Sequence, residues 1–191
     1  MTVSDHLQTL SLLGMKGAYQ SLAQVCEQDP TKTYVDYLEV LCLQEIEHRT
    51  QMRIQRLTKA AQLPRSKSLK SFEMHRQPNL SPSLIQRLAL GEFMDHHENI
   101  LIFGSPGTGK THLSLALAQE WCLMGRKVLF RTASKLVQEL QVSQQNLKLH
   151  EHIKRLDKIE VLIIDDISYL PFDVKETDVL FQLLAARYEM R

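Results

Sequence analysis

Eight residues in the middle of the chain have the types and spacing needed to bind phosphate. They read Gly-Ser-Pro-Gly-Thr-Gly-Lys-Thr, the Gly-x-x-x-x-Gly-Lys-Thr pattern of a phosphate-binding loop. Glycines let the backbone curl so that successive N–H groups point at phosphate oxygens. The ammonium of the lysine can reach the β- and γ-phosphates, and the last threonine hydroxyl can bind Mg²⁺. The pattern predicts an ATP and Mg²⁺ site formed by Gly104, Ser105, Pro106, Gly107, Thr108, Gly109, Lys110 and Thr111.

The residues on either side of this loop fit the same prediction. Residues 100–103, Ile-Leu-Ile-Phe, are expected to form a short buried strand that leads into the loop. Residues 112–124 are expected to form the helix that leaves it. A helix that starts there presents its positive N-terminal end to the phosphates, which adds to the attraction.

A second candidate part of the site lies about 50 residues further on. Residues 161–164 are apolar and are followed by Asp165 and Asp166, which is the Walker B pattern. Asp165 is expected to hold Mg²⁺ together with Thr111, and Asp166 to activate the attacking water. Lys110 and Asp166 are therefore the predicted catalytic residues.

The order of the surrounding elements predicts an α/β fold of the P-loop NTPase class. Apolar strands at 100–103, 127–131 and 161–164 alternate with helices at 134–142, 147–156 and 175–190. Continuous apolar strands that alternate with helices indicate a parallel sheet with helices on both faces. The last helix is expected to turn Val179, Leu180, Leu183 and Leu184 inward.

The first third of the chain reads as a small all-helical domain. Residues 4–29 predict one or two short helices, with Gly14 and Gly17 as possible breaks. Thr33 and Asp36 predict a capping box that opens a long helix, which Pro64 would stop near residue 63. We therefore predict a helical domain over 1–64, a Pro- and Ser-containing linker over 65–82, and an ATPase core over 83–191, which a short helix over 83–93 opens.

The long helix carries a basic stripe in its second half, defined by Arg49, Arg53, Arg56 and Lys59. These residues recur every three or four positions and so share one face. Two interpretations stay open: a solvated face, or a face that contacts DNA phosphates. The absence of an acidic residue to form i,i+4 pairs with the stripe favours the second.

Composition excludes several other classes of protein. The formal net charge is +1, and no apolar run approaches the roughly 18 residues of a membrane span. The N-terminus lacks the pattern of a secretory signal. Three cysteines without C-x-x-C spacing predict reduced thiols and a cytoplasmic protein.

Five stretches of the chain can be compared with known families: GSPGTGKTHLSLALA, LIIDDISYLP and DVLFQLLAARYE, and LGMKGAYQSL and TKAAQLP nearer the N-terminus. Together they resemble the IstB-like ATP-binding helper proteins of bacterial insertion sequences, which are AAA+ ATPases related to DnaC helicase loaders. The resemblance implies a protein that oligomerises on double-stranded DNA and directs the transposase of the same element in an ATP-dependent way.

Two departures from the family pattern qualify what the resemblance implies. Asp166 stands where many relatives have glutamate. The family core continues beyond the equivalent of Arg191 with a sensor strand, an arginine finger and a lid, so the sequence is expected to be truncated at its C-terminus. A DnaC-like helicase loader, and a chain that binds nucleotide without hydrolysing it, remain the alternative functions.

Overall fold

The computed structural model describes residues 1–63, 68–74, 77, 80–167 and 174–189. Contacts divide it into two compact units, Met1–Arg56 and Leu57–Arg191. Helix α3 (Tyr34–Ala61) begins in the first unit and ends in the second. The domain and linker boundaries near residues 64 and 82 stay predictions, and Pro64 lies outside the described residues.

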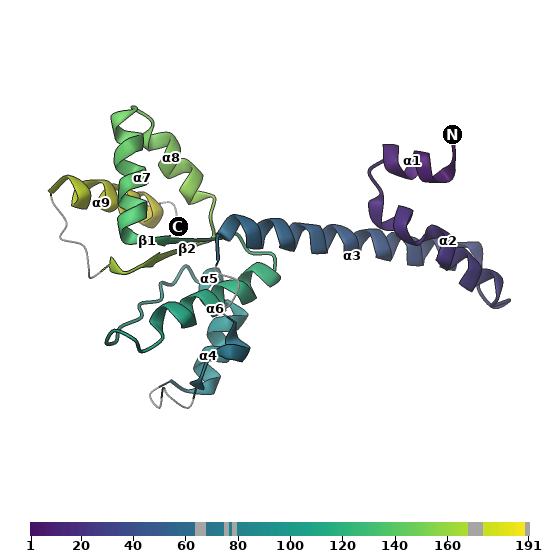
Figure 1. Ribbon diagram of the computed structural model, residues 1–191, viewed down its shortest axis with the longest axis horizontal. Helices are drawn as coiled ribbons and strands as arrows, with labels where there is room; N and C mark the ends of the chain where they lie inside the picture. Colours follow the sequence, from purple (N-terminus) through teal and green to yellow (C-terminus); the bar gives the residue numbers. More distant parts are fainter. Residues whose placement is uncertain (64–67, 75–76, 78–79, 168–173, 190–191) are drawn as a thin grey trace. The chain divides into compact units, whose positions relative to one another are not determined.

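The first unit consists of α1 (Val3–Thr9), α2 (Leu13–Glu27) and most of α3 (Figure 1). The prediction of breaks at Gly14 and Gly17 is wrong, because both glycines lie inside α2. The chain instead turns just before α2, where Ser11 has a φ of 57°. Gly14 has a packing role: a Cβ there would lie 2.8 Å from the Gln44 carbonyl oxygen and from the Glu45 Cα. Glycine thus lets α2 approach α3 closely.

A buried carboxylate joins α2 to α3. Glu45 is only 5% exposed, and its Oε2 accepts hydrogen bonds from the backbone N–H groups of Gly14 (2.7 Å) and Met15 (3.2 Å). Its Oε1 accepts one from the Arg49 Nε at 2.7 Å. Burial by itself raises the pKa of Glu45, but the hydrogen bonds from Arg49 and the two amides outweigh it and lower the pKa below its ordinary value. Glu45 therefore satisfies amides at the start of α2 that have no partner within that helix.

Replacing Glu45 should loosen α2 from α3. We expect Glu45→Gln to destabilise this contact by about 2 kcal/mol, because charge-assisted hydrogen bonds to buried groups become neutral ones. Hydrogen exchange of the Gly14 and Met15 amides should accelerate accordingly. Since the pKa of Glu45 is lowered in the fold, wild type should lose the same protection as pH falls past the ordinary glutamate range and through that lowered pKa.

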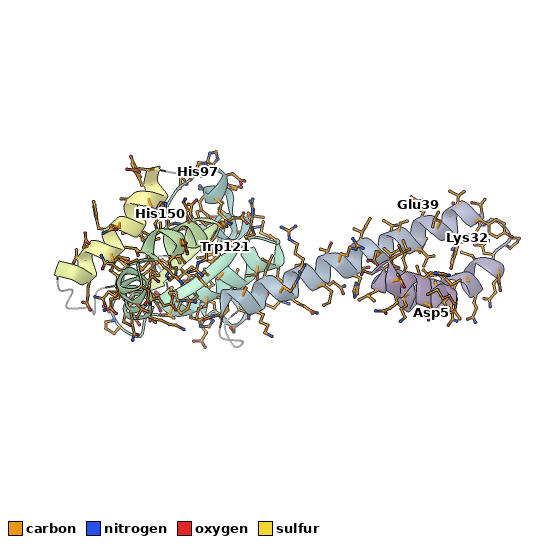
Figure 2. All side chains as sticks on the ribbon, turned by 90° about the horizontal axis from the view of Figure 1, so that it is seen from above. Asp5, Lys32, Glu39, His97, Trp121 and His150 are labelled. Carbon is orange, nitrogen blue, oxygen red and sulfur yellow. The ribbon has the colours of Figure 1, made fainter. Side chains whose placement is uncertain are left out.

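The matched control is Glu39→Gln, on an exposed position of the same helix (Figure 2). It should leave the exchange of both amides unchanged. Equal protection in the Glu45 variant and in this control would show that Glu45 does not hold α2 in place.

The second unit contains the remaining helices and both described strands. Its elements, in chain order, are the 3₁₀ helix η1 (Leu69–Ser71), α4 (Pro82–Leu90), α5 (Glu92–Asp95), α6 (Lys110–Leu123), β1 (Val128–Thr132), α7 (Ala133–Gln145), α8 (Leu149–Asp157), β2 (Val161–Asp165) and α9 (Val174–Glu189). The helix predicted over 83–93 is broken at Gly91, whose φ of 76° ends α4 in a left-handed cap.

The two strands form a parallel pair with helices on both faces (Figure 1). Their side chains alternate between two hydrophobic cores. One core, which contains α6, includes Val128, Val161 and Ile163. The other core, which contains residues of α7, α8 and α9, includes the next residue along the strand in each case: Leu129, Leu162 and Ile164. A parallel sheet covered on both sides confirms the predicted α/β class.

The predicted strand at residues 100–103 is wrong. The segment belongs to neither a helix nor a strand, and Leu101 and Phe103 are 75% and 87% exposed. Ile100 packs against the α6 core, so only part of the apolar run is covered. A strand requires a neighbour for its backbone groups, and in the described structure this segment pairs with neither β1 nor β2.

Helix α9 packs on the α7–α8 side. Val179, Leu180 and Leu183 are buried as predicted, but the prediction for Leu184 is wrong, because its side chain is 49% exposed. Arg187 donates to the carbonyl oxygens of Leu156 (2.8 Å) and Ile159 (3.1 Å), at and just beyond the end of α8. A positively charged side chain that binds these carbonyl oxygens stabilises the C-terminal end of α8.

Candidate nucleotide site

The phosphate-binding sequence forms an irregular loop that ends where α6 begins. Gly107 and Gly109 have φ angles of 78° and 88°, in the left-handed region that glycine adopts without strain. Gly109 is the N-cap of α6, and no side chain caps that helix end. The first-turn amides of α6 are therefore not taken up by a capping side chain and suit an anion.

Lys110 lies over the loop from which it emerges. Its Nζ donates hydrogen bonds to the carbonyl oxygens of Gly104 (2.8 Å) and Ser105 (3.0 Å). The Thr108 hydroxyl also donates to the Ser105 oxygen, at 2.8 Å. The ammonium is thus held beside the loop, where a phosphate could exchange for the two carbonyl oxygens.

The end of β2 meets the start of α6 through one hydrogen bond. Thr111 Oγ1 donates to Asp165 Oδ2 at 2.8 Å, although the two residues are 54 positions apart. A hydroxyl and a carboxylate oxygen are ligands that suit Mg²⁺, which takes its other ligands from phosphate and water. The residues present therefore fit the ion. The described residues contain no group of three or more His, Cys, Asp or Glu side chains that would hold a metal without such extra ligands.

Asp166 leaves the strand in an unusual conformation. Its φ is 59°, in the left-handed region that aspartate adopts more readily than most residues with a side chain. The residue is exposed and is among those that line the same cavity as Lys110. A second carboxylate, directly after β2, thus lies beside the phosphate loop.

A cavity of about 610 Å³, within the size range of small-molecule sites, lies beside the loop, and the predicted site residues Gly104, Ser105 and Asp165 are not among those that line it. Its lining comes from the phosphate loop, from Asp166 and from a segment that precedes α4: Ser71, Phe72, Glu73, Gln77, Pro106, Gly107, Thr108, Gly109, Lys110, Thr111, His112 and Asp166. Sequence reasoning missed Ser71, Phe72, Glu73 and Gln77, which it assigned to a linker. No pattern in this segment marks it as part of a site.

The basic stripe is not uniform. The statement that no acidic residue pairs with it is wrong, because Glu45 forms an i,i+4 ion pair with Arg49. Arg49, Arg53 and Arg56 border a second cavity of about 560 Å³ in the first unit, together with Ser11, Leu13, Glu45, His48 and Met52. Lys59 lies further along α3, in the second unit.

No helix among the described residues is both long and apolar enough to cross a membrane.

The cysteines Cys26, Cys42 and Cys122 are all free thiols. Burial raises the pKa of Cys122 to about 11, so this thiol stays protonated at neutral pH.

The sequence of this chain is similar to those of proteins that are named as ATP-binding. The model of the family "IstB-like ATP binding protein" matches residues 5–191. A Sinorhizobium fredii protein named as an insertion sequence ATP-binding protein is 40% identical over 81% of this chain and 52% of its own length. A protein named for insertion sequence IS21 in Pseudomonas aeruginosa is 34% identical over 94% of this chain and 69% of its own.

A third relative, named for insertion sequence IS5376 in Geobacillus stearothermophilus, is 38% identical over 82% of this chain. This chain covers 62% of that relative and about half of the Sinorhizobium protein. Because the family model spans almost the whole chain, the chain belongs to the IstB-like ATP-binding protein family.

Proposed function

We propose that this protein binds Mg²⁺-ATP in the cavity beside α6 and serves as the ATP-dependent helper of a transposition system. The observation that carries the proposal is the 2.8 Å hydrogen bond between Thr111 and Asp165, which joins the phosphate loop to the end of β2. Family membership supports it, since the relatives are named as insertion sequence ATP-binding proteins.

Each residue of the site then has a role in the proposal. The loop amides and Lys110 bind the β- and γ-phosphates, and Thr111 and Asp165 hold Mg²⁺ against them. Asp166, which lines the cavity, orients and activates the attacking water. The bound Mg²⁺ would neutralise charge that develops on the phosphate oxygens.

The DNA-binding part of the proposal rests on α3. Arg53, Arg56 and Lys59 lie on one side of a helix and provide three positive charges at the spacing expected for a phosphate-contacting face. We assign duplex DNA to this face and the transposase of the same element as the partner. We do not assign Arg49 to this face, because its guanidinium forms an ion pair with the buried Glu45.

Asp165→Asn tests the proposed metal site. The amide can still accept the Thr111 hydrogen bond, but it removes the charge that attracts Mg²⁺. We expect ATP affinity measured with Mg²⁺ to fall roughly 10- to 100-fold, which corresponds to about 1.5–3 kcal/mol for a charged interaction. In EDTA the variant and wild type should bind ATP equally.

Asp166→Asn is the matched comparison, because asparagine also tolerates a positive φ. It should retain the Mg²⁺ enhancement of ATP binding and reduce phosphate release. If Asp165→Asn kept the full Mg²⁺ enhancement, the metal site would not include Asp165.

A further inference from the structure

A short segment before α4 packs against the phosphate loop; we call its described residues, 68–74 and 77, the strap. Phe72 of the strap is 9% exposed and belongs to the same core as Leu113 and Trp121 of α6. Leu69 and Met74 pack against that core as well. The strap is therefore anchored to the helix that begins at the loop.

One tether between the strap and α6 involves His112. Its Nε2 lies 3.1 Å from the Ser71 Oγ and 3.3 Å from the Ser68 carbonyl oxygen. Ser71 already donates its hydroxyl proton to Ser68, at 2.8 Å, so the imidazole is the donor to Ser71. The His112 ring also packs edge-on against Phe72, with centroids 5.4 Å apart.

A second tether reaches the loop itself. The Gln77 side-chain Nε2 donates to the Thr108 carbonyl oxygen at 2.6 Å. The Gln77 backbone is held on both sides, because its N–H donates to the Met74 oxygen (2.9 Å) and its carbonyl accepts from the Leu80 N–H (3.0 Å). The Gln77 side chain that binds the Thr108 carbonyl therefore extends from a backbone that is itself held by hydrogen bonds.

Peptide geometry turns this contact into a constraint on phosphate binding. The carbonyl of Thr108 and the N–H of Gly109 belong to one planar trans peptide, so they point in opposite directions. When Gln77 holds the carbonyl toward the strap, the Gly109 N–H is turned the other way. A phosphate loop works only if its N–H groups face the anion, and glycine at a φ of 88° offers no side chain to resist a flip of that peptide.

We propose that Gln77 is a positioning residue for the nucleotide, which fixes the Thr108–Gly109 peptide in the orientation that phosphate binding requires. The inference rests on the proposed function, because it concerns the same phosphate loop. Gln77 acts through Thr108, from outside the loop motif.

Two substitutions of Gln77 test whether its hydrogen bond orients the Thr108–Gly109 peptide or whether the side chain only fills space. We expect Gln77→Ala to bind ATP about fivefold more weakly than wild type, because one neutral hydrogen bond is lost. Gln77→Glu should bind about tenfold or more weakly near pH 8, because a carboxylate and a carbonyl oxygen are both acceptors. Near pH 5 the carboxyl begins to take up a proton and can donate to Thr108, so the deficit relative to wild type should shrink.

The control is Gln86→Glu, on an exposed position of α4 in the same unit. It should bind ATP like wild type at both pH values, and all variants should remain folded under the assay conditions. Wild-type affinity in both Gln77 variants would overturn the inference while leaving the proposed function intact. Absence of ATP binding by wild type itself would overturn the proposed function and the inference with it.

Discussion

Lys110→Ala should nearly abolish ATP binding. In the described structure the Lys110 ammonium lies within 3.0 Å of the Gly104 and Ser105 carbonyl oxygens, directly on the phosphate loop. Removing a charge that pairs with a desolvated phosphate costs about 2–5 kcal/mol, or roughly 30- to several-thousand-fold in affinity. Titration calorimetry with Mg²⁺-ATP measures the change.

Lys135→Ala serves as the matched control. Lys135 is an exposed lysine on α7 in the same unit, so its removal changes the net charge equally without touching the loop. It should bind ATP as wild type does. If the Lys110 variant also bound ATP normally, the cavity beside α6 would not be the phosphate site.

Replacing the basic face of α3 should lower the salt dependence of DNA binding. For duplex DNA the slope of log affinity against log salt is roughly −0.9 per phosphate contact, so Arg53→Ala/Arg56→Ala/Lys59→Ala should lower its magnitude by roughly 2.7. Because phosphate contacts carry no sequence information, the loss should be similar on unrelated duplexes. Fluorescence anisotropy over a range of salt concentrations gives the slope.

A second triple variant, Lys135→Ala/Lys148→Ala/Lys154→Ala, controls for the change in net charge. All three lysines are exposed in the second unit. If both triple variants reduced the slope equally, the effect would come from total charge and α3 would be an ordinary solvated helix. Arg49→Ala is kept separate, since it also leaves the buried Glu45 without its ion pair.

Much of the fold follows from local sequence signals. The Thr33–Asp36 capping box is present: the Thr33 N–H donates to the Asp36 carboxylate at 2.7 Å, and the Asp36 N–H donates back to the Thr33 hydroxyl. The apolar runs at 127–131 and 161–164 became β1 and β2, each within a residue of its predicted bounds. These signals are local, so they needed no knowledge of distant partners.

The failures at residues 100–103, Gly14 and Gln77 depend on contacts between distant parts of the chain. Residues 100–103 have the composition of a strand, but strand formation depends on a neighbour with which to share backbone hydrogen bonds. Gly14 was interpreted as a helix breaker because its close approach to Glu45 is visible only when α2 and α3 are packed. The same holds for Gln77, whose hydrogen bond to Thr108 spans 31 positions.

Trp121 provides the most direct measurement of whether nucleotide binds beside α6. It is the only tryptophan in the chain and is 3% exposed within the second unit (Figure 2). It lies eleven positions along α6 from Lys110, or about 17 Å at 1.5 Å per residue, which is close enough for energy transfer to a mant-labelled ATP. We expect Trp121 emission to fall and mant emission to rise on addition of mant-ATP with Mg²⁺, excess ATP to reverse both changes, and Lys110→Ala to show neither. Transfer that persists undiminished in Lys110→Ala, or no ATP-reversible transfer in wild type, would contradict a nucleotide site on this loop.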